Sequence, residues 1–262
     1  MSHRAFKRFD SRSLSYPQGM ISRLTVAALL AIGALAPVVA CAGGSDNSLR
    51  KQLAKSAPQA NAQIIALALK ARHCAIETGI AKPSSRLAII DFTRPSTVAR
   101  LWLFDLDHPS LVLSEPVAHG RESGGNFARS FSNVEGSAKS SLGLFKTSEA
   151  YTGNDGYALR MDGLEPGVND NARLRNIVIH GAWYVDPQQA LKQGRLGRSL
   201  GCPSVRMDVI HPVVDNLKQG QMLFAYYPDP DWLARSPLLH CDESGAAQRT
   251  KSAPERRPAS PH

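Results

Sequence analysis

Cysteine is scarce in this sequence, and other features that mark common protein classes are missing. The 262 residues contain four cysteines, and Cys202 has no second cysteine within 30 residues. A thiol redox protein normally uses two close cysteines, so this class is disfavoured. No set of His, Cys and carboxylate residues with metal-ligand spacing surrounds Cys202. The sequence therefore predicts a protein that uses no metal and no other cofactor.

A nucleic-acid-binding pattern of aromatic and arginine residues is also missing. The formal net charge is +9, but residues 1–23 carry five basic side chains and one acidic one, so their removal leaves about +5. This mild basic excess fits attraction to anionic cell-wall polymers or lipid headgroups better than binding of nucleic acid. We therefore expect no nucleic-acid partner.

The first 40 residues are typical of an export signal. A basic segment precedes the apolar run 24–40, which predicts a signal peptide over 1–40 and an exported protein of the periplasm or cell envelope. An uncleaved transmembrane anchor is the alternative, for which 17 residues with a glycine and a proline are short. Val38-Val39-Ala40-Cys41 also resembles a bacterial lipobox. Two outcomes are open: simple cleavage, or acylation of Cys41 and a membrane tether.

Export leaves three cysteines in an oxidising compartment: Cys74, Cys202 and Cys241. Because the number is odd, at least one of them stays outside an intramolecular disulfide. The simplest pairing joins Cys74 to Cys241, which flank the central region, and leaves Cys202 as the thiol. Three reduced and buried cysteines are the alternative.

The centre of the chain predicts one mostly β domain. Its length and the unusual composition of both ends leave about 150–190 residues for a single core. Short β-rich runs, separated by clusters of Gly, Ser, Asn, Asp and Pro, begin at residues 86, 99, 110, 143, 157, 175 and 221. No internal repeat of fixed period occurs.

Helices and irregular segments are expected around these runs. Residues 43–60 are small and polar and predict a tether, whereas apolar residues at helical spacing predict a helix over 60–76. A second helix is expected over 208–218. The resulting limits are 1–40 for the signal, 41–85 for the linker and N-terminal helix, 86–228 for the catalytic domain, and 229–262 for a C-terminal extension that is disordered from about residue 242.

Cys202 stands in a run of small residues, "GRSLGCPSVR", between Gly201 and Pro203. A turn at this place exposes the thiol, while a buried structural cysteine is the alternative. A nucleophilic thiol needs a base that accepts its proton. His180 ends the apolar run "NIVI" and is followed by Gly181, which predicts an imidazole at the end of a strand.

Together, "IVIHGAWY" and "SLGCPSVR", with the cysteine 22 residues after the histidine, resemble the signature of the L,D-transpeptidases, the YkuD-type cysteine enzymes of peptidoglycan. The resemblance is closest to the murein L,D-transpeptidase catalytic domain family and covers about residues 86–228. It implies a YkuD-like mixed β-sandwich or barrel with a few short helices, preceded by an N-terminal helix. The chain departs from the family at the S-H-G-C motif, in which an arginine follows two residues after the cysteine. Here the nearest arginine after Cys202 is Arg206, four residues on.

The resemblance implies a role for each of these residues. Cys202 would attack the carbonyl of the third residue of a peptidoglycan tetrapeptide stem, and His180 would take the thiol proton. The Gly181 carbonyl would orient the imidazole, and the N–H groups of Gly201 and Cys202 would hold the oxyanion. Two further residues have two interpretations each: Ser199 binds substrate or caps a turn, and His119 lines the cleft or is structural. Arg206 would bind a substrate carboxylate only if it replaces the family's arginine.

The expected activity is removal of the terminal D-Ala and transfer of the acyl group to an amine, which makes a 3→3 crosslink. If water attacks instead, the enzyme is an L,D-carboxypeptidase, and the sequence does not choose between the two. A wall-binding protein that keeps the cleft without turnover is a further alternative. The expected partners are peptidoglycan stem peptides.

Overall fold

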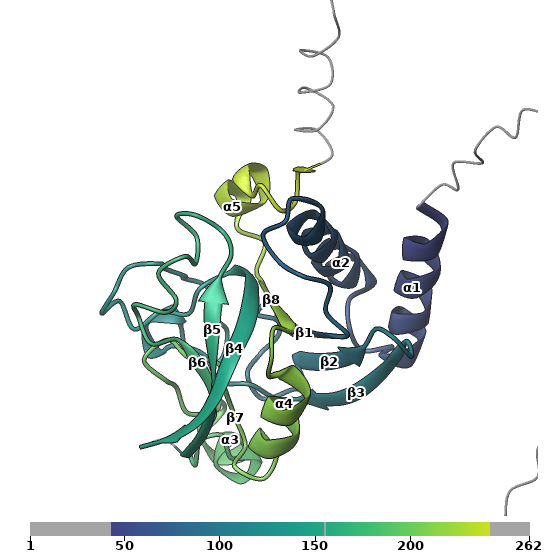
Figure 1. Cartoon of the computed structure of the whole chain (residues 1–262). Helices are drawn as coiled ribbons and strands as arrows, with labels where there is room; N and C mark the ends of the chain where they lie inside the picture. Colours follow the sequence, from purple (N-terminus) through teal and green to yellow (C-terminus); the bar gives the residue numbers. More distant parts are fainter. Residues whose placement is uncertain (1–42, 155, 242–262) are drawn as a thin grey trace, which may run out of the picture. The chain divides into compact units, whose positions relative to one another are not determined.

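Eight strands form one sheet in the residues that the structure describes, 43–154 and 156–241 (Figure 1). The structure is a computed structural model. The spatial order of the strands is β3-β2-β1-β8-β4-β5-β6-β7. β1 is parallel to β8 and β6 to β7, whereas the other neighbours are antiparallel. The strands are β1 (Arg86–Asp91), β2 (Leu101–Asp105), β3 (Ser110–Glu115), β4 (Gly143–Gly153), β5 (Gly156–Gly163), β6 (Val178–Gly181), β7 (Ser204–Val205) and β8 (Met222–Tyr226).

The sheet nearly closes on itself through the backbone that follows β3. The N–H of Ala118 donates to the carbonyl of Ser204 in β7 at 2.8 Å, and Gly120 forms a bridge with Ser199. Residues 117–121, which we call the closing segment, therefore connect the two ends of the strand order. The described residues thus form a mostly β, nearly closed sheet with five short helices, and the predicted fold class is confirmed.

The β-rich runs predicted from the sequence each contain a strand, because their apolar residues form the core. Trp102, Phe104, Phe145 and Phe224 are fully buried at its centre. β7 was not predicted, since it has only two residues and shows no periodicity. Pairing with β6 and with the closing segment makes this short piece a strand.

Five helices surround the sheet in the described part of the chain (Figure 1). They are α1 (Gly43–Ser56), α2 (Ala62–Glu77), α3 (Pro187–Gln193), α4 (Ile210–Leu217) and α5 (Pro230–Arg235). α2 matches the helix predicted over 60–76, and it begins where the side chain of Asn61 accepts a hydrogen bond from the N–H of Gln63 at 2.8 Å. α4 matches the helix predicted over 208–218, with Pro212 tolerated in its first turn.

The segment that we predicted as a polar tether is largely the helix α1, so this prediction is wrong. Leu53 and Ala57 are almost fully buried, and Leu49 packs partly against the core. These residues stand four apart and form one narrow apolar stripe along otherwise polar residues. With so few apolar residues among many serines, lysines and glycines, the helical periodicity could not be recognised in the sequence.

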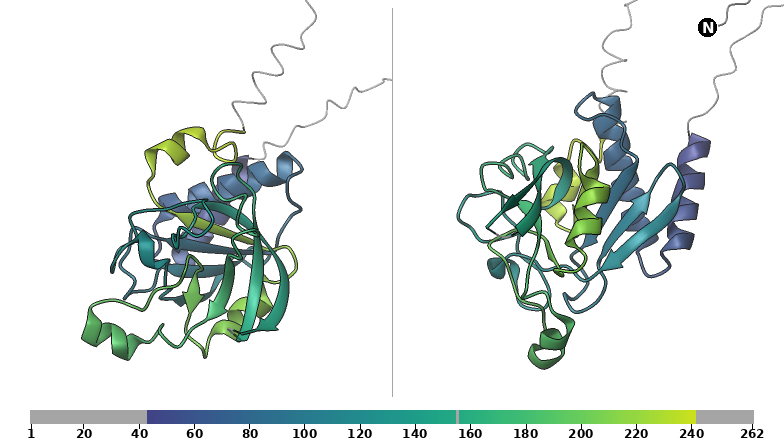
Figure 2. Two further views of the ribbon diagram at one scale, coloured as in Figure 1. Left: turned by 90° about the vertical axis from the view of Figure 1, so that its left-hand side faces the viewer. Right: turned by 60° about the horizontal axis from the view of Figure 1, so that its bottom comes forward.

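The sequence analysis also missed α3 and α5, although both carry a local signal. Asp186 and Asp229 cap the two helices with their side chains, and each is followed by a proline in the first turn. Asp-Pro is a good helix start, because aspartate accepts from the first free N–H groups and proline lacks the N–H that would go unpaired. Figure 2 shows α3 projecting from the body of the molecule.

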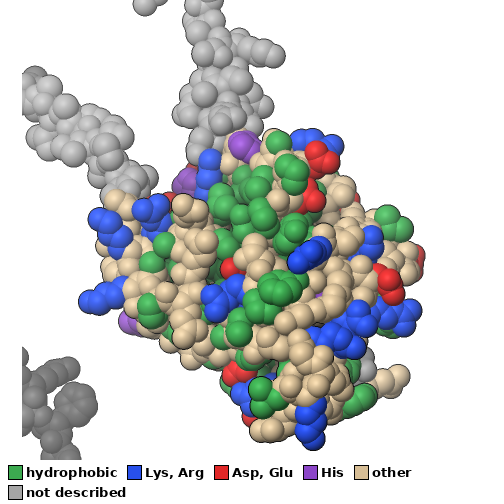
Figure 3. Space-filling model, turned by 180° about the vertical axis from the view of Figure 1, so that it is seen from behind, with side chains coloured by type: hydrophobic (Ala, Val, Ile, Leu, Met, Phe, Trp, Pro, Cys, Tyr) green, Lys and Arg blue, Asp and Glu red, His purple; other side chains and the backbone are tan. Residues whose placement is uncertain are grey.

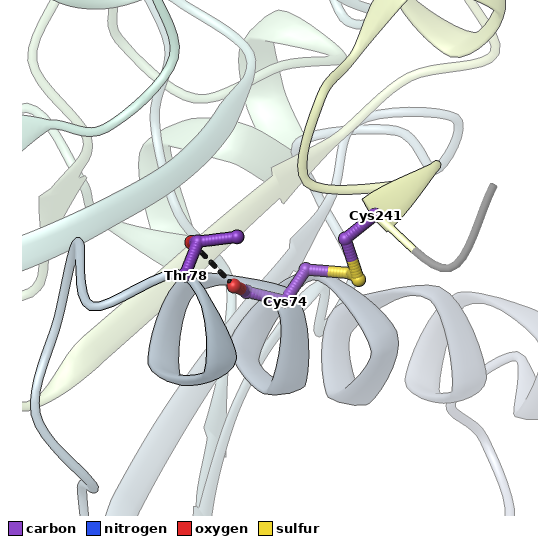
Figure 4. The surroundings of a disulfide bond; sticks show 3 residues. All are labelled: Cys74, Thr78 and Cys241. Atoms are coloured by element: carbon purple, nitrogen blue, oxygen red, sulfur yellow. Dashed lines mark hydrogen bonds between the residues drawn. A yellow bond between two sulfur atoms is a disulfide. The ribbon is translucent and has the colours of Figure 1, made fainter. Parts of the chain in front are cut away.

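A disulfide joins Cys74 in α2 to Cys241, beyond α5 (Figure 4). The Cα atoms of the two residues are 5.6 Å apart. The hydroxyl of Thr78 donates to the carbonyl of Cys74 at 2.6 Å, which secures the end of the helix. The simplest pairing predicted from the sequence is therefore confirmed, and Cys202 is a thiol.

Buried Glu165 fixes α5 to the sheet. One of its carboxylate oxygens accepts from the N–H of Leu144 at 2.8 Å. The other accepts from Trp232 Nε1 at 2.9 Å and from the hydroxyl of Ser236 at 2.6 Å. Because these donors compensate the buried carboxylate, Glu165 acts as a structural anchor between β4 and the C-terminal helix.

Several sequence predictions concern residues that the structure does not describe. The export signal over 1–40, the lipobox cysteine Cys41 and the tail from about residue 242 all lie outside the described residues. Among the helices of 43–154 and 156–241, none has the length and hydrophobicity needed to span a bilayer.

Candidate active site

β6 carries the predicted histidine, and the adjacent strand β7 begins two residues after the predicted cysteine. In their parallel pairing, His180 lies opposite Ser204 and Gly181 opposite Val205. The apolar residues before His180 bury β6 throughout, so the imidazole is held at the end of a core strand and is only 7% exposed. The residues between the histidine and the cysteine form an excursion that carries α3 and returns at β7 (Figure 1).

Both ring nitrogens of His180 have a hydrogen-bond partner. Nδ1 lies 3.0 Å from the carbonyl oxygen of Gly181, and Nε2 lies 2.9 Å from the hydroxyl of Ser204. A carbonyl can only accept, so Nδ1 carries the proton of the neutral ring. Nε2 is then an acceptor, and the Ser204 hydroxyl donates to it. The structure thus places the Gly181 carbonyl where the sequence analysis expected it.

Ser204 is a site residue that the sequence analysis missed. Its hydroxyl is fully buried and also lies 3.1 Å from the Tyr184 hydroxyl. Since the single proton of Ser204 points to His180, the Tyr184 hydroxyl donates to Ser204. Ser204 stands two residues after Cys202, where the S-H-G-C motif carries arginine. The alternation of side chains along a strand, which puts residues two apart on one face, is the signal that could have identified it.

The thiol of Cys202 lies against the backbone just before His180. The N–H of Val178 points to Cys202 Sγ at 3.5 Å, and Sγ lies 3.6 Å from the carbonyl oxygen of Asn176. Cys202 is half-buried, whereas Ser204 is fully buried. Only the sulfur therefore combines a place on the strand pair of the histidine with access from outside.

The turn that carries Cys202 is stabilised by Ser199. Its hydroxyl accepts from the N–H of Gly201 at 3.0 Å and donates to the carbonyl of Cys202 at 2.7 Å. Ser199 thus caps the turn, which is one of its two predicted roles. Because the Gly201 N–H is already engaged, the Cys202 N–H is the better candidate for an oxyanion donor. Gly201 has φ +136°, and a Cβ atom there would lie 2.9 Å from the carbonyl of Lys139, so glycine is required.

His119 does not line a cleft. Its side chain is fully buried, Nδ1 accepts from Arg100 Nη2 at 2.7 Å, and Nε2 faces the carbonyl of Gly124 at 3.4 Å. Burial and the neighbouring Arg100 charge lower the pKa of His119 to about 4. Of the two predicted interpretations, the structure favours a structural histidine.

Arg206 is bound to carboxylates of the protein itself. Nε and Nη2 donate to the two oxygens of Glu115, each at 3.0 Å, and Nη1 donates to Asp208 at 2.6 Å. These ion pairs raise the pKa of Arg206 and use its binding groups. A substrate carboxylate would have to displace a bidentate partner, so we do not assign Arg206 to substrate binding.

The surroundings of the site are apolar and basic. Leu200, next to the cysteine turn, is 68% exposed, and Trp183, in the excursion after His180, is 74% exposed. On the face shown in Figure 3, Lys and Arg side chains are spread widely among few acidic ones. Among the described residues, no three His, Cys, Asp or Glu side chains are arranged to hold a metal ion.

A thiol beside the strand that carries a histidine oriented by a carbonyl is typical of cysteine enzymes that transfer acyl groups. The family model of the L,D-transpeptidase catalytic domain matches residues 56–226. This match covers more than half of the chain, which therefore belongs to the L,D-transpeptidase catalytic domain family. The matched region begins before the predicted domain limit of residue 86 and includes α2.

Several solved structures with this name are similar to the chain. For an L,D-transpeptidase from Mycobacterium smegmatis, the identity is 13% and the TM-score 0.34, over 55% of this chain and 59% of that one. For an L,D-transpeptidase from Xylanimonas cellulosilytica, the identity is 15% and the TM-score 0.32, over 59% of this chain and 68% of that one. For one from Stackebrandtia nassauensis they are 11% and 0.33, over 70% and 90%. No curated protein sequence matches the chain.

Proposed function

We propose that this protein is a cysteine L,D-transpeptidase that acts on peptidoglycan stem peptides, with Cys202 as nucleophile and His180 as general base. Membership of the family supports the reaction class. The single observation that supports the residue assignment is the position of the half-buried Cys202 thiol, which lies 3.5 Å from the N–H of Val178 in the strand whose His180 has a defined tautomer.

In the first half of the reaction, His180 Nε2 takes the proton of the Cys202 thiol. The sulfur attacks the carbonyl carbon of the third stem residue and forms a tetrahedral oxyanion. The Cys202 N–H donates to this oxygen, and one such donor contributes roughly 3 kcal/mol. The C–N bond to the terminal D-Ala then breaks, the imidazolium returns its proton to the leaving amine, and a thioester remains.

Ser204 can serve both protonation states of His180. It donates to Nε2 in the neutral ring. When Nε2 has taken the thiol proton, the same oxygen accepts from Nε2–H, and the serine proton turns toward Tyr184. A hydroxyl suits this place, because it can donate and accept, whereas the arginine of the S-H-G-C motif could only donate.

In the second half, the side-chain amine of another stem attacks the thioester. An amide forms, the C–S bond breaks and the thiol is regenerated, which gives the 3→3 crosslink. Attack by water would release a free acid and define an L,D-carboxypeptidase. We favour transfer to the amine, because it is the reaction after which the family is named.

The cellular setting is part of the proposal. Residues 1–40 act as an export signal, so the enzyme meets peptidoglycan in the periplasm or cell envelope. Acylation of Cys41 would tether it to the membrane. Labelling with palmitate in cells that produce wild type or Cys41→Ser tests the tether, and label that is equal in both proteins would refute it.

The activity is tested by incubating the purified protein with a disaccharide tetrapeptide. We expect mass spectrometry to detect released D-Ala and a crosslinked dimer with the wild type. Cys202→Ala should abolish both products, and His180→Asn should slow D-Ala release by about 10²–10⁴-fold, the usual contribution of a general base. A carbapenem, expected to acylate the nucleophile of this family, should add its mass to the peptide that contains Cys202.

His108→Gln is the matched control, because the side chain of His108 is 90% exposed on the turn between β2 and β3. It should leave D-Ala release unchanged. D-Ala without dimer would identify the carboxypeptidase. Binding of the tetrapeptide without any product from the wild type would identify the wall-binding alternative and refute an enzyme.

A further inference from the structure

Arg175 lies beside the turn that carries Cys202, immediately before β6. A Cβ atom on Gly201 would be 3.4 Å from Arg175 Nη2, so the guanidinium borders the residue preceding the cysteine. On its other side, the carbonyl of the next residue, Asn176, faces Cys202 Sγ at 3.6 Å. The Arg175 guanidinium therefore lies next to Gly201, and the Cys202 thiol lies next to the carbonyl of the residue that follows Arg175.

Only neutral groups bind Arg175 in the hydrogen bonds found within the described part of the chain. Nη1 donates to the carbonyl of Ser132 at 2.6 Å and to the hydroxyl of Ser141. Nη2 donates to the carbonyl of Lys139 at 2.6 Å and to the hydroxyl of Ser137 at 3.1 Å. Nε is buried and has no partner among these residues.

The contrast with two neighbouring arginines is informative. Arg173, two residues earlier, pairs with Glu149 and Asp162. Arg206, after β7, pairs with Glu115 and Asp208. Each of these charges is compensated by carboxylates within 3.0 Å. Arg175 is held rigidly by neutral acceptors instead, so its charge remains available to an anion next to it.

We propose that Arg175 is a positioning residue whose guanidinium stabilises the thiolate of Cys202. The position two residues after the cysteine, where the family carries arginine, is occupied here by Ser204. This role rests on the proposed function, because a nucleophilic cysteine must reach its thiolate form near neutral pH.

Electrostatic coupling between the two groups agrees with this geometry. Burial lowers the pKa of Arg175, and the negative charge of a Cys202 thiolate acts in the opposite direction. Coupling is reciprocal, so a cation favoured by the thiolate also favours that thiolate. Other charged or titratable groups also lie on elements around the cysteine turn: His180 on β6, Lys139 on the loop bound by Arg175, His119 and Arg121 on the closing segment, Tyr184 beside Ser204, Arg198 before Ser199, and the paired Arg206.

The test follows the rate at which iodoacetamide alkylates Cys202 in the full chain between pH 5 and 10. Mass spectrometry of the peptide that contains Cys202 distinguishes alkylation of this thiol from alkylation of Cys41. For the wild type, we expect the midpoint of the rise of the alkylation rate with pH to lie below the ordinary thiol pKa of about 8.5. Arg175→Gln should raise the midpoint by about one pH unit, which slows alkylation about tenfold near neutral pH.

Two further variants separate charge from structure. Arg175→Lys retains the positive charge, so its midpoint should be closer to that of the wild type than to that of Arg175→Gln. Arg173→Gln is the matched control, because the charge of Arg173 is already compensated. Its midpoint should equal that of the wild type.

The proposal is overturned if Arg175→Gln folds, as judged by circular dichroism, and keeps the wild-type midpoint. A wild-type midpoint at or above about 8.5 also overturns it and needs no variant. A midpoint shift without D-Ala release by the wild type would refute the proposed function while leaving the effect of Arg175 on the thiolate established.

Discussion

At the scale of single residues, the site depends on which hydrogen bonds each polar group already makes. Ser204 is fully buried and can reach only groups inside the strand pair, whereas the half-buried Cys202 can be reached by a substrate. His180 is fixed from both sides, by the Gly181 carbonyl and by Ser204. The ring is held in the tautomer whose Nε2 accepts a proton, so only the Ser204 hydroxyl has to turn away before the transfer, which is an advantage in catalysis.

Ser204→Ala tests this restraint. Loss of one hydrogen bond to Nε2 costs about 1 kcal/mol, so D-Ala release should slow roughly fivefold. The ¹⁵N chemical shifts of the His180 ring should show a second tautomer that the wild type lacks. Tyr184→Phe, which removes the hydroxyl that donates to Ser204, should have a smaller effect. An unchanged rate together with an unchanged ring spectrum in Ser204→Ala would show that Ser204 does not position the histidine.

The sequence predicted the nucleophile and base better than it predicted the groups around them. Cys202 and His180 could be found because thiol and imidazole are rare and each ends a recognisable pattern. Serine and arginine are common, so residue type alone does not distinguish Ser204 from Ser199 or Arg175 from Arg206, and only the two-residue spacing from Cys202 points to Ser204. Their roles depend on strand register and on which charges are already paired, and neither can be read from spacing.

At the scale of elements, the closing segment depends on a buried arginine–histidine pair. Arg100, at the start of β2, is fully buried, and burial lowers its pKa to about 9. Its guanidinium donates to the carbonyl of Val117 and to His119. Because both acceptors belong to the closing segment, the contact between this segment and β7 rests on His119 remaining neutral.

Acid should therefore weaken this connection. In the unfolded chain His119 binds its proton near the ordinary pKa of about 6.5, whereas in the folded protein the pKa is about 4. The stability supplied by neutral His119 is complete above the unfolded value and is lost as the pH falls from there toward the folded one. We expect the free energy of unfolding in urea to fall by about 2 kcal/mol between pH 7 and pH 5 from this residue alone.

His119→Asn is the matching variant, because its side-chain oxygen can accept from Arg100 but cannot take up a proton in this range. Its unfolding free energy should change much less over the same interval. An equal fall in wild type and variant would mean that protonation of His119 does not control the closing segment.

The elements themselves were predictable where many apolar residues share one periodicity. β1, β2 and β8 are almost continuously buried runs, and α2 has a broad apolar face. α1 has a narrow stripe and β7 has two residues, so both owe their structure to partners from distant parts of the chain. Tertiary contacts of that kind leave little trace in local sequence.

At the scale of the whole molecule, the disulfide connects the family region to the segment that follows it. Cys74 lies within residues 56–226, whereas Cys241 lies beyond their end. The bond closes a loop over a sequence separation of 167 residues, which includes every strand and the proposed nucleophile. A crosslink over so long a loop restricts the unfolded chain strongly.

Removing both cysteines with Cys74→Ala and Cys241→Ala should lower the free energy of unfolding by about 2–5 kcal/mol, as measured in urea. Reductant should destabilise the wild type similarly and leave the double variant unaffected. Cys202→Ala is the control, since it keeps the disulfide and should respond to reductant as the wild type does. A double variant as stable as the wild type would show that Glu165 and the core hold α5 without the crosslink.

The contact between Ala118 and Ser204 has a consequence for how a stem peptide can be recognised. With β6 on one side and the closing segment on the other, the strand after Cys202 offers no vacant edge along which a peptide could be added by main-chain pairing. A donor peptide of the proposed reaction would then be bound through side chains rather than through main-chain hydrogen bonds to β7.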